Sequence, residues 1–526
     1  MTDNNVTAAQ RELIRSIGHL LNTSNVRTYK QSKIIHDAIW GTCEFSPWEA
    51  GLLDLPIFQR LRGLKQTGFA YLTYPAAEHS RFQHILGVTH AAAAVFDSLC
   101  KRLSADGLSP RARPNLKALS DLSDQDTAAR NRILLRLAGL VHDLGHSLLS
   151  HTSERIFALI NPFPALISVF LEQYDKKPGA AEVVVYLLVT SPEWYETVAT
   201  VWKRASGPGT APTPDEWLRI GLWVMGIEPT RGRKFLCDII SGPLDADKLD
   251  YIARDAYFAG IPVARDVDRF MSTVCVDRQG DDWYRISLPL NKGVNAIEQL
   301  VMSKLVLFSY LYHHQKVRAA EVAFERALAR EYLSAGRVAQ LANVWDLFAI
   351  QDAHLYAISG GRPGVTRCSD VQFRVLPKRV AEFREQDVTL DDPKKKAHSV
   401  NAYRKLSRLT KPKSWDDYKA LLEFEDDLAR RSELPVESVI VDFPDDPSYG
   451  DLESLVLPGR SPDEQTTAKE HLSYSDWIQA YNKHRVYSRV FASSNDDVAL
   501  DKLWRLLVSE FAARDLRLTE RLRVRK

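Results

Sequence analysis

The feature that most constrains the fold is a short segment in which ligand-type side chains directly follow an apolar stretch. Residues 133–141 space their apolar side chains three and four apart, which is typical of a helix that packs into a core. His142 and Asp143 come next, and His146 and His151 follow within the same ten residues. A lone His-Asp pair is more typical of a surface or capping position. Four such residues beneath a buried helix instead favour a metal site.

A second segment, residues 244–261, also has the periodicity of a helix. Asp247, Tyr251 and Asp255 recur every four residues and therefore share one face of that helix. The opposite face is expected to be buried and consists of Leu249, Ile252, Ala253 and Ala256. Because a polar stripe on a buried helix is costly unless it faces a cavity, these three side chains are candidate cavity residues.

The remaining pattern predicts a mainly α protein with an HD-type helical core and a smaller α+β C-terminal lobe. We expect an N-terminal leader at residues 1–30, the core at 31–330 and the lobe at 331–526. Further helices are predicted at residues 53–64 and 296–328, a hairpin at 274–288, and strands at 371–376, 438–443 and 454–457.

Composition excludes several classes of protein. The chain has 526 residues, of which 45% are hydrophobic and 26% charged, so it is neither mainly disordered nor a disulfide-stapled miniprotein. Its net charge is only +2, so any anionic ligand must be met by a local cationic site. No apolar run reaches the length of a membrane span, and the five cysteines are scattered. We therefore expect a cytoplasmic protein with no membrane partner.

His84, His142, Asp143 and Asp247 reproduce the H…HD…D signature of the HD metal-dependent phosphohydrolases. More closely, the chain resembles the deoxynucleoside triphosphate triphosphohydrolases, both dGTPase-like enzymes and the vertebrate type that has a sterile-alpha-motif domain. We expect no such domain here, because the segment before residue 31 is too short for one. The resemblance extends over residues 33–330, and its matching stretches are residues 58–66, 81–88, 142–151 and 245–255.

The resemblance implies that one divalent ion is bound by His84, His142, Asp143 and Asp247. Two imidazoles and two carboxylates suit Mn, Mg, Fe, Zn or Co, and the absence of a cysteine argues against a structural zinc cage. In the family, water attacks the α-phosphorus of a dNTP and releases deoxynucleoside and triphosphate. We expect His151 to be the general acid, with Glu154 orienting its ring and His146 contacting phosphate.

By the same resemblance, Arg81, Lys248 and Lys304 would contact phosphates, and Tyr251 would donate a hydrogen bond. Gln66 and Asp255 would contact the sugar 3′-hydroxyl, and Tyr312 would shape the base site. The chain differs from the family pattern at one position, where the family has a further active-site histidine and this chain has Ala181.

Family members of the vertebrate type bind an activating nucleotide between subunits of a tetramer. Lys33, Asp54, Gln59 and Arg62 match that allosteric nucleotide site, so a homo-oligomer (dimer or tetramer) is expected. Asp54 could instead cap the helix that begins near Pro56. Two alternative functions stay open. One is an HD phosphodiesterase acting on a cyclic or oligomeric nucleotide; the other is a low-turnover protein that senses nucleotides or binds nucleic acid, for which residues 394–396 are the candidate basic cluster.

Overall fold

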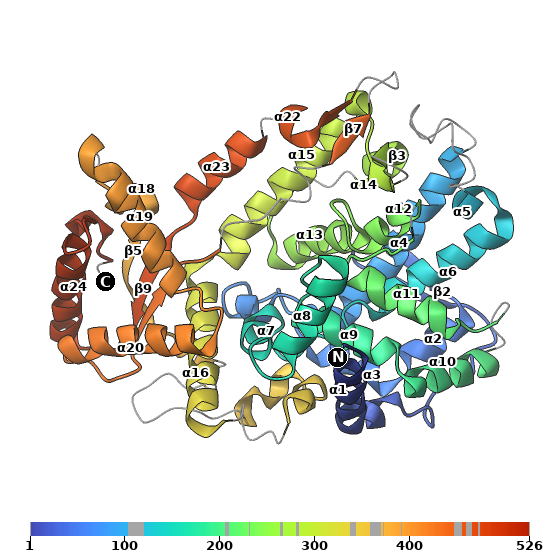
Figure 1. Ribbon diagram of the computed structural model, residues 1–526, viewed down its shortest axis with the longest axis horizontal. Coiled ribbons are helices and arrows are strands. Elements are labelled where there is room, and N and C mark those ends of the chain that lie inside the picture. Colours follow the sequence, from blue (N-terminus) through green and yellow to red (C-terminus); the bar gives the residue numbers. More distant parts are fainter. Residues whose placement is uncertain are drawn as a thin grey trace.

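The computed structural model of the protein describes residues 2–103, 120–205, 210–230, 232–263, 267–279, 283–336, 343–357, 370–371, 373–390, 392–445, 455–458, 465–471 and 474–524. The structure is mainly α-helical with small antiparallel sheets, as predicted. Figure 1 shows a large helical body that contains the N-terminus and a smaller group of helices and strands near the C-terminus, with α16 (Gln315–Ala335) between them.

Three helices form the centre of the helical body. Helix α4 (Arg81–Leu103) packs against both α6 (Gln125–Val141) and α13 (Ala246–Ala259). The other helices of this body are α1 (Thr2–Ile17), α2 (Pro47–Leu53), α3 (Pro56–Arg60), α5 (Ser120–Ser123), α7 (His151–Phe157), α8 (Phe163–Tyr174), α9 (Ala180–Val189), α10 (Pro192–Arg204), α11 (Pro214–Val224), α12 (Lys234–Ile240), α14 (Val267–Thr273) and α15 (Leu290–Leu307).

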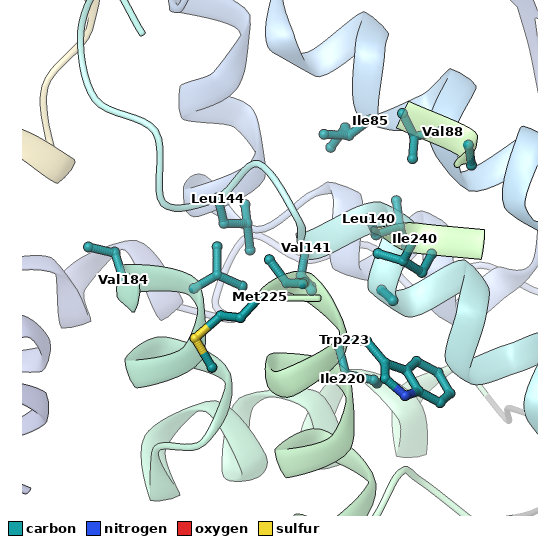
Figure 2. Packing of buried hydrophobic residues seen from close by; sticks show 14 of the residues in the cluster. Ile85, Val88, Leu140, Val141, Leu144, Val184, Ile220, Trp223, Met225 and Ile240 are labelled. Atoms are coloured by element: carbon teal, nitrogen blue, oxygen red, sulfur yellow. The ribbon is translucent and has the colours of Figure 1, made fainter. Parts of the chain in front are cut away.

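The end of α6 is fixed by apolar packing. Leu140 and Val141 are fully buried, and they pack with Trp223 and Met225 at the end of α11 in the same large cluster (Figure 2). Burial of a large apolar side chain contributes about 1.5–3 kcal/mol, so this packing holds the residues that follow α6 firmly in place. The predicted apolar faces of α6 and α13 are both confirmed as buried.

Two short hairpins flank these helices. The predicted hairpin at 274–288 is confirmed as β3 (Cys275–Gln279) paired antiparallel with β4 (Trp283–Ser287). Another, β1 (Lys33–Asp37) with β2 (Gly41–Phe45), lies beside α4.

Two helices that were predicted to be continuous are each interrupted, so the prediction of a single helix was wrong in both places. Residues 53–64 contain the end of α2 and the short α3, because Leu55 precedes a proline and is extended, with ψ 140°. Residues 296–328 are divided between α15 and α16. A π-helical turn at Phe308–Tyr312 and an extended His314, with ψ 133°, separate the two helices.

The C-terminal lobe contains a three-stranded antiparallel sheet in the order β5-β9-β6, formed by Lys378–Phe383, Ser488–Ala492 and Val439–Asp442. Its helices include α18 (Glu385–Val388), α19 (Pro393–Leu409), α20 (Trp415–Arg431) and α24 (Asp497–Ala512). Phe383, Phe443 and Trp504 belong to a separate apolar cluster of this lobe. The remaining C-terminal elements, β7 (Val456–Pro458), β8 (Gln465–Thr467), α22 (Ala468–His471) and α23 (Tyr474–Arg485), lie instead on the helical body, where β7 contacts β3 and β4 and α23 contacts α15 (Figure 1).

The strand predictions for this lobe had mixed outcomes. Residues 438–443 contain β6, and residues 454–457 overlap β7. The predicted strand at 371–376 is wrong, because its described part turns at Arg374, whose φ of 63° is left-handed. The basic residues 394–396 lie in the first turns of α19. Among the described residues, no helix is both long and apolar enough to cross a membrane.

Candidate metal and substrate site

The predicted metal ligands come from three elements that meet in the helical body. His84 lies in the first turn of α4, His142 and Asp143 follow the end of α6, and Asp247 lies in the first turn of α13. The ligand atoms of His84, His142 and Asp247 all lie within 4.8 Å of one another. Asp143 adds a carboxylate whose Oδ1 is 3.3 Å from His142 Nε2. The four predicted ligands therefore converge on one point.

Both imidazoles are oriented through their second ring nitrogen. His84 Nδ1 lies 2.7 Å from Asp250 Oδ2, and His142 Nδ1 lies 2.8 Å from the carbonyl oxygen of Gly139. In each ring Nε2 is thereby directed toward the converging ligands. This arrangement is the usual support for histidines that bind metals, so the residues present fit a divalent cation.

Asp143 has a strongly cationic neighbourhood. Arg81 Nη1 donates a 2.6 Å hydrogen bond to Asp143 Oδ2, and both side chains are almost fully buried. Burial raises the pKa of this carboxyl, but Arg81 and the neighbouring His142 and His146 outweigh that effect and hold the pKa well below its usual range. Asp143 is therefore ionised at neutral pH, as a carboxylate that binds a cation must be.

A second group of side chains lies beside the first. His146 Nε2 is 3.1 Å from Asp143 Oδ1, and its Nδ1 contacts Glu154. The other oxygen of Glu154 lies 3.2 Å from His151 Nδ1, and the His151 side chain is 80% exposed. One carboxylate therefore orients both predicted active-site imidazoles and leaves His151 Nε2 free of that contact. Burial raises the Glu154 pKa, but His146 and His151 outweigh it and lower the pKa.

These residues open into a cavity of about 390 Å³. Part of its wall was predicted from the sequence, and part comes from α16 and the C-terminal lobe. It is lined by Gln66, Arg81, Asp143, His146, His151, Thr152, Arg155, Asp247, Tyr251, Asp255, Phe308, Tyr312, His313, Arg318, Glu321, Glu325 and Asp445.

The part of the cavity formed by α13 is a polar surface, as the helix periodicity predicted. Asp255 accepts a 2.5 Å hydrogen bond from the Tyr312 hydroxyl, and its other oxygen lies 2.9 Å from His79 Nε2. Gln66 Oε1 and Arg81 Nη2 are buried without a hydrogen-bond partner in the described part of the chain. Unpaired buried groups of this kind are costly, so both atoms are suited to a bound ligand.

Two predicted phosphate ligands do not line the cavity. The Lys248 ammonium donates to the carbonyl oxygen of Gly242 and to Asp245. Lys304 lies in α15 with its ammonium 5.8 Å from the centre of the Phe308 ring.

Several residues that line the cavity were not predicted from the sequence, among them Arg155, Arg318 and Asp445. Arg155 directly follows Glu154, which is the only sequence signal that could have pointed to it. The other two depend on the packing of distant segments.

Ala181, the residue predicted to stand where the resembling family has a histidine, lies in the first turn of α9 and is 5% exposed. Its backbone is close to the loop of residues 142–150, which carries the predicted metal ligands His142 and Asp143, because a Cβ placed on Gly145 would lie 2.0 Å from the Ala181 carbonyl oxygen. Glycine at position 145 is therefore required for this close approach.

The residues predicted for an allosteric nucleotide site are only partly brought together. Lys33 and Arg62 line a second cavity of about 640 Å³, and the Arg62 guanidinium lies 3.7 Å from the centre of the Phe82 ring. Asp54 instead accepts a 2.8 Å hydrogen bond from the Tyr29 hydroxyl. Gln59 Oε1 accepts a 2.8 Å hydrogen bond from Arg62 Nε. Asp54 ends α2 and does not cap α3.

No protein-family model matches the sequence. The chain is 30% identical over 308 residues to the uncharacterized protein YwfO of Bacillus subtilis, covering 58% of this chain and 55% of that protein. It is 31% identical over 293 residues to the human deoxynucleoside triphosphate triphosphohydrolase SAMHD1, covering 54% of this chain and 42% of that protein. A SAMHD1 homolog of Dictyostelium discoideum is 26% identical over 313 residues, covering 59% and 51% of the two chains.

The chain thus spans about half the length of the curated relatives it matches. A crystal structure of a hypothetical protein from Aquifex aeolicus has the same fold, with a TM-score of 0.59, 21% identity, and coverage of 92% of this chain and 100% of that chain. The sequence matches confirm the resemblance to the HD-domain deoxynucleoside triphosphate triphosphohydrolases.

Proposed function

We propose that the protein is a metal-dependent hydrolase that converts deoxynucleoside triphosphates into deoxynucleoside and triphosphate. The observation that carries this proposal is the convergence of His84, His142, Asp143 and Asp247 beside one cavity, which Asp143 and Asp247 line. Similarity to SAMHD1 supplies the substrate class.

A divalent ion held by these four residues would polarise the α-phosphate and orient a water for in-line attack. The water oxygen bonds to the α-phosphorus while the bond from phosphorus to the sugar 5′ oxygen breaks. His151 gives the proton that the leaving oxygen needs, and Glu154 holds the imidazole in place. His146 and the free Nη2 of Arg81 face phosphate oxygens.

The deoxyribose end would be bound by residues on the α13 side of the cavity. The unpaired Oε1 of Gln66 and the carboxylate of Asp255 are acceptors for the 3′-hydroxyl. Tyr251 donates to a phosphate oxygen, and Tyr312 holds Asp255 and borders the base. Lys248 and Lys304 stay proposed phosphate ligands that would have to turn toward the substrate.

We extend the proposal to regulation. An activating nucleotide would bind in a homo-oligomer at the cavity that holds Lys33 and Arg62. Asp54 and Gln59 would also contact this nucleotide, after Asp54 loses its hydrogen bond from Tyr29 and Gln59 loses its hydrogen bond from Arg62. Hydrolysis of dNTPs would serve to control nucleotide pools, or would limit phage replication by depleting nucleotides.

The test is incubation of the purified protein with each dNTP, singly and mixed, with Mn²⁺ or Mg²⁺, followed by chromatography. We expect deoxynucleoside and triphosphate without dNMP or dNDP, and none from Asp143→Ala. Mono- or diphosphate products, or hydrolysis of cyclic and oligomeric nucleotides alone, would favour the phosphodiesterase. Ligand binding without turnover, unchanged in Asp143→Ala, would favour a sensing protein that lost activity with Ala181.

A further inference from the structure

The cavity is lined by three arginines, and two of them are held by buried acids. Arg81 pairs with Asp143 at 2.6 Å, and Arg318 Nη2 lies 2.7 Å from Asp442 Oδ1. Their side chains are only 1% and 9% exposed. Arg155, on α7, is different because its side chain is 46% exposed.

Arg155 shares its main partner with a second cation. Arg155 Nη2 lies 3.0 Å from Asp445 Oδ2, and Lys411 Nζ lies 3.1 Å from Asp445 Oδ1. One carboxylate therefore bridges a guanidinium and an ammonium where the C-terminal lobe meets the cavity. Partial burial raises the Asp445 pKa, but Arg155 and Lys411 outweigh it and lower the pKa. The two cations thus create a place that favours a negative charge.

The other acids around Arg155 have partners of their own. Glu325 Oε2 is 3.8 Å from Arg155 Nη1, but Glu325 Oε1 accepts 2.7 Å hydrogen bonds from Arg326 and from the Tyr418 hydroxyl. Glu321 also lines the cavity and pairs with Arg318 at 2.7 Å. Asp445 is thus the nearest acid to Arg155 and the one of the three with the most exposed side chain, 59%.

We propose that Arg155 and Lys411 form an anion subsite for a phosphate group of a polyphosphate, and that Asp445 fills this subsite when no ligand is bound. The identification of the ligand as the triphosphate of a nucleotide rests on the proposed function. A phosphate group carries more negative charge than a carboxylate and matches the two-pronged donors of arginine. Because Asp445 is more than half exposed, it can return to water at little cost when phosphate replaces it.

The test measures the binding of inorganic tripolyphosphate by calorimetry, with Mg²⁺ in excess and no nucleotide present. Asp445→Asn removes the competing charge and should tighten binding about two- to fivefold, the range expected for losing an exposed ion pair. Arg155→Gln should weaken binding about tenfold, as for loss of a charged hydrogen bond, with Arg155→Lys in between. In the double variant, Asp445→Asn should restore little of the tripolyphosphate affinity that Arg155→Gln removes.

The matched control is Asp427→Asn, which breaks an ion pair to Arg431 of 3.1 Å whose side chains are both 45% exposed and do not line the cavity. It should leave tripolyphosphate binding unchanged, and all variants should keep the thermal midpoint of the wild type. Equal affinities in wild type, Asp445→Asn and Arg155→Gln, or no binding to the wild type, would overturn the subsite.

Hydrolysis of dNTPs is measured separately, so the two proposals can fail independently. Turnover with unaltered tripolyphosphate binding in the variants would reject the subsite and leave the proposed reaction intact. The expected binding pattern without turnover of any dNTP would support the subsite and reject the reaction.

Discussion

At the scale of single residues, His313 predicts how stability depends on pH. It is 7% exposed, packs edge to face on Phe308, and lacks a partner for Nδ1 in the described part of the chain. Burial and the nearby Arg318 lower its pKa to about 3, despite the opposing effect of Asp442. The usual value in an unfolded chain is about 6.5. Between these values the unfolded state binds more protons, so the folded state loses stability as the pH falls.

His313→Gln should therefore reduce the loss of stability on acidification. The slopes of unfolding free energy against pH should differ by up to about 1.4 kcal/mol per pH unit between about pH 6 and about pH 4. Urea unfolding at a series of pH values measures this difference. The exposed His19, replaced by glutamine, is the control and should follow the wild type. Parallel slopes for wild type and His313→Gln would show that His313 already titrates normally in the folded protein.

Residue identity alone predicted a site at His142, Asp143, His146 and His151, because these residues are close in sequence, whereas His84 and Asp247 were added to it by the family resemblance. It could not predict Asp250, which supports His84 from α13, since that role depends on how two helices cross. The same limit applies to Asp445, a lobe residue whose contact with Arg155 spans 290 positions.

At the scale of elements, the approach of the loop of residues 142–150 to α9 predicts a strict requirement for Gly145. A Cβ there would lie 2.0 Å from the carbonyl oxygen of Ala181 and 2.8 Å from its carbonyl carbon, which are backbone atoms that cannot rotate away. Gly145→Ala should destabilise the protein by about 1–3 kcal/mol, as overpacking does. Because the same loop carries Asp143 and His146, Gly145→Ala should also lower the metal content of the purified protein. Thermal unfolding and metal analysis of the purified variant check both.

The matched control is Gly179→Ala, at the start of the same helix α9. A Cβ there would meet only the Glu182 side chain, at 3.9 Å, so the free energy of unfolding should change by less than about 1 kcal/mol. Similar losses in both variants would contradict a specific clash at Gly145.

Periodicity predicted the helices that carry the site but not where the long ones break. The spacing over 296–328 is continuous, yet the chain is extended at His314, whose ring accepts a hydrogen bond from the Lys316 amide. That break, with the π turn before it, brings Tyr312 and His313 to the cavity. A favourable local pattern was therefore overridden by tertiary contacts that no short window contains.

At the scale of the whole molecule, α16 joins the cavity to the C-terminal lobe through ion pairs. Arg318 contacts Asp442 of β6, Arg326 contacts Glu425 of α20, and Arg330 contacts Asp426 of α20, as the position of α16 in Figure 1 suggests. The sequence indicated a separate C-terminal character but held no motif for this connection. The lobe thus supplies both a wall of the cavity and partners for buried charges.

Asp442→Asn tests how strongly the lobe is coupled to the core. Asp442 is 3% exposed, and its loss as an anion would leave Glu321 as the one remaining ion-pair partner of Arg318 among the described residues. Breaking a buried pair costs about 3–5 kcal/mol, and the remaining Glu321 should keep the cost near the lower end. Asp426→Asn, whose bidentate pair with Arg330 is more exposed, should cost less, about 1–2 kcal/mol. Urea unfolding compares the two variants.

Replacing the pair by Arg318→Met with Asp442→Leu should recover part of the stability, because no unpaired charge is then buried. If Asp442→Asn costs no more than Asp426→Asn, the buried pair does not couple the lobe to the core. If instead the variant unfolds in two steps while the wild type unfolds in one, the pair is what makes lobe and core a single cooperative unit. The wall of the cavity formed by Asp445 would then depend on the same contact, since Asp445 lies three residues after Asp442, the last residue of β6.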